Sequence, residues 1–291
     1  MGGMDRLQKI LLIALVSTSA GAWVVSQAFQ ADMMNAMAAP QSALSVSLFV
    51  AVWTAGMAAM MFPAISPVVL LYNRLAKNSD SNATLLVEGG KGPYSVKMVL
   101  FIGCYLAVWA LTGLVLLLGW SLLLNSAIAA TGLSSIIYGS ILVAAGAYQF
   151  SPLKAKCLGY CESPMSFFMR RWRNGTLGAV TMGTYHGLYC LGCCWSYFLL
   201  MVALGWMDIL WMALFAGIIF GEKMWSRGIW IARAAGIGLA IAGGIAALGM
   251  IDISGYGAMT SDQGMQEPSS MQDRMEDSGM QDQMSDGGMD M

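Results

Sequence analysis

Charge and histidine are scarce in this sequence. Asp, Glu, Lys and Arg together make up 11% of its 291 residues and there is a single histidine, whereas apolar residues make up 57%. So little charge does not suit a soluble domain, and it offers no basic surface for nucleic acid. The apolar residues instead gather in runs close to the roughly 20 residues that cross a bilayer as a helix. The composition therefore predicts an all-α, polytopic membrane helix bundle, with the lipid bilayer as a partner and no nucleic acid.

We expect about seven transmembrane helices from these apolar runs. The first run is too long for the apolar core of a cleavable signal peptide and has no clear cleavage site, so we interpret it as a retained span. The sixth run is the shortest. The predicted spans cover residues 7–29, 43–72, 97–120, 133–150, 176–204, 207–221 and 230–250.

Lys and Arg are absent from three of the loops between these spans, namely the first, the third and the fifth. They gather at the N-terminus and in the second, fourth and sixth loops instead. Because basic loops stay on the cytoplasmic side of a membrane, this split predicts a multi-pass protein of the cell membrane. Its N-terminus is cytoplasmic and its C-terminus extracytoplasmic. Of the fifteen basic residues, only Arg274 lies on the outer side.

The stretch 182–201 concentrates residues that bind soft metals. It contains the only histidine and three of the six cysteines of the chain. At about 100° per residue, its sulfur, imidazole and phenol side chains fall within roughly a third of the helix circumference. Imidazole, thiolate and thioether on one stripe form a soft-metal ligand set. The stripe consists of Met182, His186, Cys190, Cys193, Cys194, Tyr197 and Met201.

Each of these residues also has a purely structural interpretation. Cysteine is a small core residue, methionine fills gaps between helices, and a lone histidine can simply hydrogen-bond a neighbour. The combination favours function, because an ionisable group at membrane depth is expensive and marks a functional site by default. We therefore predict a metal or redox site at His186, Cys190, Cys193 and Cys194.

Three methionines in the second predicted span repeat the soft-ligand theme. Met57, Met60 and Met61 are spaced i, i+3 and i+4, so they share a helix face. Pro63 follows them and should kink the helix, leaving backbone carbonyls that neighbours must satisfy. A methionine-lined packing face is the alternative interpretation. Counted from opposite ends of antiparallel spans, Met57 and Cys190 each lie about 20 Å deep, so we expect the methionines and the cysteine stripe to face each other.

The predicted cytoplasmic side carries a second thiol pair and a charged pair. Cys157 and Cys161 lie four residues apart in the loop 151–175, which makes them a secondary candidate site where a soft metal docks. Glu222 and Lys223 close the sixth span at the inner face, where we expect them to pair with each other or to extend towards water.

The end of the chain differs from the rest. Residues 252–291 are acidic and polar with few aromatics, so we expect a disordered extracytoplasmic tail after a transmembrane domain at 1–251. Methionine is unusual in such a tail, and thioethers bind Cu(I) but bind Zn(II) poorly. The alternatives are low-complexity drift and a partner-binding tail. The tail methionines, further candidate ligands, are Met259, Met265, Met271, Met275, Met280, Met284, Met289 and Met291.

Several motifs together resemble a family of predicted metal-binding integral membrane proteins, formerly described as a domain of unknown function. The resemblance covers roughly residues 43–230, and its combined pattern of AMMxP, GCCW and a later EK is specific. Some family members are regarded as membrane copper chaperones for copper-dependent oxidases, so the resemblance implies copper binding and delivery. The matching positions are Trp53, Met57, Met60, Met61 and Pro63; residues 148–154 with Cys157, Cys161 and Pro164; His186, Gly187, Cys190, Gly192, Cys193, Cys194 and Trp195; and Gly205, Met207, Trp211, Met212, Glu222 and Lys223.

The sequence thus predicts a membrane copper chaperone, not an enzyme, that delivers Cu(I) to a membrane or extracytoplasmic copper enzyme. A pump is disfavoured because no ATP-binding motif of the GxxxxGK[ST] type is present. Two alternatives stay open. The first alternative is an accessory subunit of a membrane copper oxidase or monooxygenase. The second is a membrane thiol–disulfide oxidoreductase that uses Cys190 and Cys193 as a CxxC pair.

Overall fold

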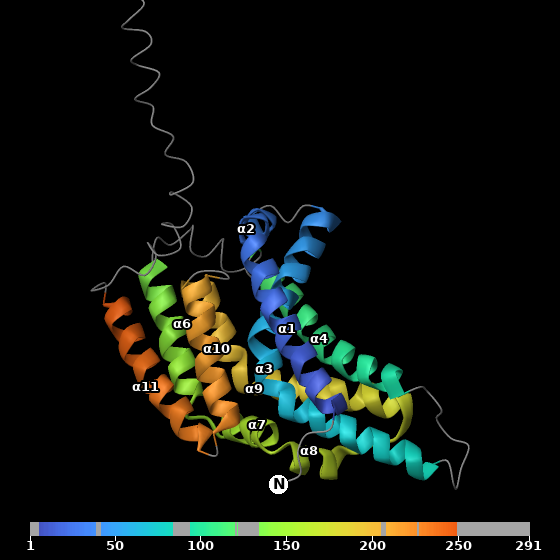
Figure 1. The fold of residues 1–291 in the computed structure, drawn as a ribbon. Helices are drawn as coiled ribbons and strands as arrows, with labels where there is room; N and C mark the ends of the chain where they lie inside the picture. The colour runs from blue at the N-terminus through green and yellow to red at the C-terminus, as the bar shows by residue number, and fades with distance from the viewer. Residues whose placement is uncertain are drawn as a thin grey trace, which may run out of the picture.

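The computed structural model describes residues 6–38, 42–83, 94–119, 121, 134–204, 208–225 and 227–248. Over these residues the fold is all-helical, with ten helices and no strand (Figure 1). The predicted tail at 252–291 lies outside the described residues. The helices are α1 (Arg6–Ala28), α2 (Gln30–Ala38), α3 (Ala43–Ala83), α4 (Tyr94–Gly119), α6 (Ser134–Tyr148), α7 (Pro152–Glu162), α8 (Pro164–Arg171), α9 (Gly175–Leu204), α10 (Ile209–Met224) and α11 (Gly228–Ala247).

Four of the described helices are long and apolar enough to cross a membrane: α1, α3, α4 and α11. A fifth crossing results if α6 and α7, which are bent by 62° at their junction, count as one broken span. Each of the predicted spans coincides with a helix, but two of these helices do not meet the same standard. Helix α9 has 30 residues but is not among the helices that are apolar enough over their described residues. Helix α10 has 16 residues, fewer than the roughly 20 that a straight span needs.

The segment 151–175, predicted as a loop, contains two short helices. Ser151 caps α7 by accepting a hydrogen bond from the Lys154 amide, with Pro152 in the first turn. Pro164 likewise lies in the first turn of α8, although Ser163 makes no side-chain cap there. Proline suits the first turn of a helix because its missing N–H has no helical partner there. The prediction missed both helices because it took the basic residues of this segment as a loop signal.

Two prolines lie inside α3, and both freed carbonyls find a partner. A proline at position i leaves the carbonyl of residue i−4 without its helical hydrogen bond. Pro63 frees the carbonyl of Ala59, which accepts a hydrogen bond from the Ser19 hydroxyl of α1 at 2.6 Å. Pro67 frees the carbonyl of Pro63, which accepts one from the Ser66 hydroxyl at 2.8 Å. Neighbouring hydroxyls thus satisfy the carbonyls, as predicted.

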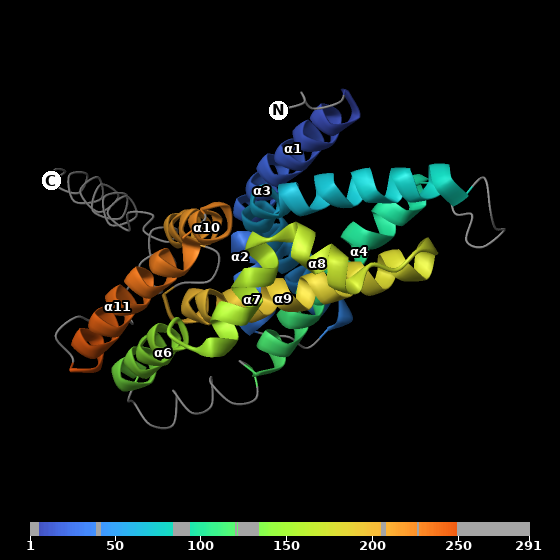
Figure 2. The same ribbon diagram turned by 90° about the horizontal axis from the view of Figure 1, so that it is seen from below.

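Helix α9 runs through the middle of the bundle and packs against α4, α6, α7 and α10 (Figure 2). Its contact with α4 depends on two glycines four residues apart, a spacing that lets two membrane helices approach closely. A Cβ at Gly183 would lie 2.3 Å from the Phe101 carbonyl oxygen, and one at Gly187 would lie 3.0 Å from the Val108 side chain. The close approach places His186, between these glycines, against α4.

Helices α6 and α11 form a second close pair at one side of the bundle (Figure 1). A Cβ at Gly139 would lie 2.7 Å from the Ala247 amide nitrogen, and one at Gly146 would lie 2.7 Å from the Gly236 carbonyl oxygen. The two backbones therefore touch directly, which leaves no room for larger residues at these positions.

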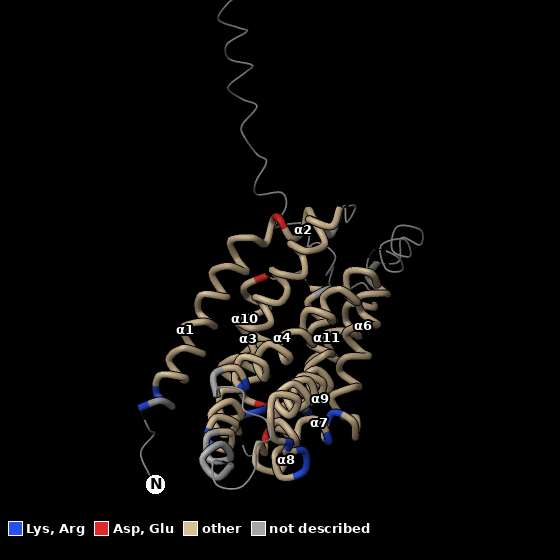
Figure 3. The backbone as a smooth tube through the Cα atoms, turned by 90° about the vertical axis from the view of Figure 1, so that its right-hand side faces the viewer, with Lys and Arg blue, Asp and Glu red and all other residues tan. Residues whose placement is uncertain are grey.

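The charges of the described residues are unevenly placed. Lys and Arg gather at the end of the bundle where α1 begins and where α7 and α8 lie (Figure 3). The acidic Asp32 and Asp208 lie at the start of α2 and of α10, towards the opposite end. The fold thus collects the basic ends of antiparallel helices on one side.

Candidate metal centre

The predicted stripe of α9 faces the interior of the bundle. All of its side chains are at most 1% exposed, as expected for one helix face packed against several neighbours. They are Met182, His186, Cys190, Cys193, Cys194, Tyr197 and Met201.

A sulfur pair joins α9 to α3 at the centre of this face. The Cys190 Sγ lies 3.9 Å from the Met61 Sδ. The Lys223 ammonium of α10 donates to both sulfurs, at 2.9 Å to Cys190 and at 3.6 Å to Met61. The Tyr105 hydroxyl of α4 lies 3.2 Å from the same Cys190 sulfur. Four helices therefore converge on one thiol, with a full positive charge beside it.

A chain of thiols continues from this pair towards α7. The Cys193 thiol donates to the Cys190 carbonyl at 3.1 Å and lies 3.2 Å from the Cys194 sulfur. The Cys161 sulfur of α7 lies 3.8 Å from the Cys193 sulfur. Cys161, predicted as part of a separate cytoplasmic site, is thus buried beside the main cluster. Cys157 packs against Gly192, where a Cβ would lie 2.7 Å from its sulfur.

The other predicted ligands are buried but less closely joined to the thiols. Met57 and Met60 lie on α3 with 0% and 2% exposure, and the sulfur contact to Cys190 comes from Met61 alone of the three. His186 is surrounded by the rings of Phe101, Tyr105 and Phe167, with centroids 5.5 to 6.3 Å away. Within the described residues, neither of its ring nitrogens has a hydrogen-bond partner. A buried imidazole with two unused nitrogens is free to bind a metal.

A buried ion pair fixes the helices around the thiols. The Lys154 ammonium of α7 donates to the Glu222 carboxylate of α10 and to the Cys193 carbonyl, both at 2.7 Å. The Tyr197 hydroxyl of α9 donates to the other Glu222 oxygen at 2.5 Å. Lys154 and Glu222 are both fully buried.

The expected role of Glu222 and Lys223 is therefore wrong. They do not pair with each other, because consecutive helix residues point about 100° apart, and neither extends towards water, because both are buried. Glu222 contacts α7 and α9, and Lys223 contacts α9 and α3. Sequence reasoning marked this pair but not its direction. It missed Tyr105 and Lys154, the first of which carries no signal beyond being a tyrosine in an apolar helix.

The donor set fits a soft ion with few ligands. Within the described residues, no three His, Cys, Asp or Glu side chains are grouped closely enough to hold one metal ion. Thiolate and thioether are both soft ligands, and the Cys190–Met61 pair supplies one of each.

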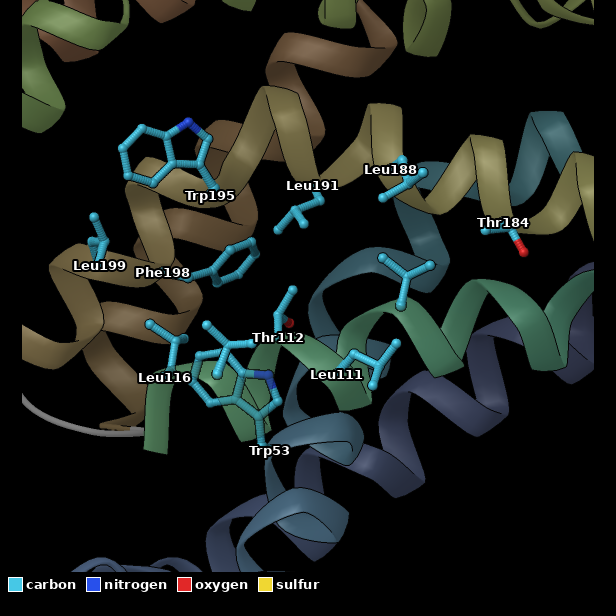
Figure 4. A pocket seen from close by; sticks show the side chains of 12 residues that line it. Trp53, Leu111, Thr112, Leu116, Thr184, Leu188, Leu191, Trp195, Phe198 and Leu199 are labelled. Carbon is cyan, nitrogen blue, oxygen red and sulfur yellow. The ribbon is translucent and has the colours of Figure 1, made fainter. Parts of the chain in front are cut away.

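A cavity among the described residues is a different kind of site. It has a volume of about 440 Å³ and lies between α3, α4 and α9 (Figure 4). Trp53, Trp195 and Phe198 line it together with leucines, and no cysteine, methionine or histidine is among the described residues of its wall. Its chemistry is that of an apolar, lipid-like environment, so we separate it from the metal centre.

The comparisons with known proteins agree with the donor set. A model of the PpoB2 copper chaperone family matches residues 50–246. This range includes the sulfur pair of Cys190 and Met61 and the chain of thiols beside it. No curated protein and no solved structure matches the chain. Because the family model covers more than half of the sequence, the chain belongs to the PpoB2 copper chaperone family.

Proposed function

We propose that this protein binds Cu(I) inside the membrane and passes it to a copper-dependent enzyme of the membrane or the extracytoplasmic space. The observation that carries the proposal is the buried sulfur pair of Cys190 and Met61 in a chain of further thiols. Thiolate and thioether together select Cu(I), because thioether is a poor ligand for harder ions. Membership in a copper chaperone family supports the same conclusion.

Copper is the cargo of such a protein, and the ligands divide by position. Cys190 and Met61 form the primary site, since their sulfurs already lie 3.9 Å apart. The same helix face carries Cys193, Cys194 and His186. These residues either complete the coordination of the ion or pass the ion along the face. Met57 lies one helical turn, about 6 Å, beyond Met61 on α3. Met60 directly precedes Met61 in the same turn of α3.

The route begins at the basic end of the bundle. We take this end as cytoplasmic, because Lys and Arg are retained on that side, and it is where the described basic residues gather (Figure 3). Cys157 and Cys161 on α7 lie between this end and Cys193, so they form the entrance. Met57 continues the sulfur face towards the outer end. The tail methionines, which lie beyond the last of about seven spans, then gather copper or hand it to the client.

Copper-dependent stabilisation of the detergent-purified protein tests the proposal. An ion that binds the folded state alone stabilises it by about 4 kcal/mol when its free concentration is about 1,000 times the Kd. We expect Cu(I) to raise the unfolding temperature of the wild type. Cys190→Ser and Met61→Leu should gain much less. Leucine preserves the volume of methionine, so the Met61 variant should fold with a loss below about 1.5 kcal/mol.

Matched controls separate ligand loss from general damage. Cys104→Ser changes a partly exposed thiol on α4, and Met98→Leu changes a buried methionine near the start of α4. Both control variants should gain as much stability from Cu(I) as the wild type. An equal gain in all five proteins, or a larger gain with Zn(II) than with Cu(I), would contradict the proposal.

A further inference from the structure

Lys223 lies where a metal ion between Cys190 and Met61 would bind. Its ammonium nitrogen is 2.9 Å from the Cys190 sulfur and 3.6 Å from the Met61 sulfur, and these sulfurs are 3.9 Å apart. An ion at a usual metal–sulfur distance of about 2.3 Å from both sulfurs lies at most about 4 Å from that nitrogen. On the nearer side of the sulfur pair the ion and the ammonium overlap.

The position of Lys223 is built into the fold. Its neighbour Glu222 is held by Lys154 and Tyr197, which fixes the rotation of α10 about its axis. Lys223 itself is only 6% exposed. A buried ammonium is expensive unless an anion or a lone pair compensates it, and here the sulfurs of Cys190 and Met61 supply the lone pairs.

We propose that the Lys223 ammonium and Cu(I) are alternative occupants of the position between Cys190 and Met61, so that loading exchanges one monovalent cation for another. The inference rests on the proposed function. The displaced ammonium remains tethered to α10 and keeps its charge near the site. At a given distance, this charge repels a divalent ion twice as strongly as it repels a monovalent ion. Lys223 is thus a positioning residue that selects ions by charge, whereas the sulfurs select them by softness.

The size of this selection follows from Coulomb's law. If the displaced ammonium lies about 8 Å from the ion in an effective dielectric constant of about 20, one additional unit charge weakens binding by about 30-fold. Removal of the Lys223 charge should therefore improve the binding of a divalent ion about 30-fold relative to a monovalent one.

Two soft probe ions measure this ratio in the full-length, detergent-purified protein. Ag(I) represents the monovalent cargo and Cd(II) a soft divalent ion, and competition titrations give the ratio of their affinities. Lys223→Leu removes the charge without adding a sulfur ligand, and it should shift the ratio towards Cd(II) by about 30-fold. Lys223→Arg keeps the charge and should leave the ratio close to that of the wild type. Lys156→Leu, which removes an exposed charge from α7, is the matched control and should not shift it.

A second measurement on the wild type tests the exchange without any variant. An amine-acylating reagent is applied with and without Ag(I), and mass spectrometry gives the extent of labelling at Lys223 relative to the buried Lys154. Ag(I) should raise this ratio, because the displaced ammonium loses its sulfur partners. Lys154 stays paired with Glu222 and serves as the internal reference.

The outcomes distinguish this inference from the proposed function. A wild type that binds neither Ag(I) nor Cu(I) refutes the proposed function and the exchange together. A wild type that binds Ag(I), with an unchanged affinity ratio in Lys223→Leu and unchanged labelling of Lys223, refutes the exchange alone. If Lys223→Leu keeps its fold but loses Ag(I) affinity, Lys223 is a ligand of the ion and not its competitor. If the variant does not fold, the labelling ratio decides.

Discussion

Replacement of Lys154 by methionine should destabilise the protein strongly, although methionine fits a helix and a membrane well. Lys154 and Glu222 are both fully buried, and their charged atoms lie 2.7 Å apart. Removal of one partner leaves a buried carboxylate with only the Tyr197 hydroxyl, and breaking a buried ion pair in this way costs about 3 to 5 kcal/mol. With a shift of about 2 to 4 °C per kcal/mol for a chain of this size, the unfolding temperature should fall by about 10 °C.

Thermal unfolding in detergent, followed by circular dichroism, measures the effect. The double variant Lys154→Met with Glu222→Gln removes both charges and keeps a carbonyl oxygen for Tyr197, so it should be more stable than Lys154→Met alone. Lys156→Met on the same helix is the control and should change stability by about 0.5 kcal/mol or less. If Lys154→Met alone costs less than about 1 kcal/mol, the usual value of an exposed pair, then the pair does not hold α7 against α10.

Four further predictions concern the approach of α7 and the path of copper. Gly192→Ala should cost about 1 to 3 kcal/mol in thermal unfolding, because the new methyl group would overlap the Cys157 sulfur; unchanged stability would contradict the close packing of α7 on α9. Replacement of both Cys157 and Cys161 by serine should slow copper loading but leave at least one bound copper by metal analysis, and complete loss would move the main site to these thiols. A reporter fused at Met291 should be active only if the reporter works outside the cell, and a cytoplasmic signal would overturn the topology. A synthetic peptide of residues 257–291 should bind Cu(I) against a weak competitor, and equal affinity after replacement of its methionines by leucine would exclude the tail as a ligand.

The seven apolar helices and the inward face of α9 were predictable because both follow from local pattern, whereas the polar helices α2, α7 and α8 were not. Apolar runs fix the helices, and the spacing of Cys190, Cys193 and Cys194 fixes their common face in any α-helix. The satisfied carbonyls of α3 were also predictable in kind, since a proline in lipid always leaves one that a neighbour must satisfy. The identity of the partner, Ser19 of α1, was not, because it depends on how two helices pack.

The direction of the charged side chains was not predictable for the same reason. A sequence shows that Glu222 and Lys223 end an apolar helix, but not which neighbours each one meets. The neighbours depend on the rotation of α10 about its axis and on the position of α7. The basic residues of α7 are typical of a loop between membrane spans, so the sequence did not indicate a helix there. Cys161 illustrates the point, since its distance to Cys193 depends on Gly192 allowing α7 to approach.

The hydrogen bond from Ser19 to the Ala59 carbonyl also defines the register between α1 and α3. Helix α1 is apolar along most of its length, and such a helix can slide along its neighbour by one turn with little change in van der Waals packing. Only one register places the Ser19 hydroxyl opposite a carbonyl that Pro63 has left without a partner. Any other register leaves that carbonyl unpaired in lipid, which costs several kcal/mol. A proline on one helix and a serine on another thus act together as an alignment mark for the assembly of the bundle.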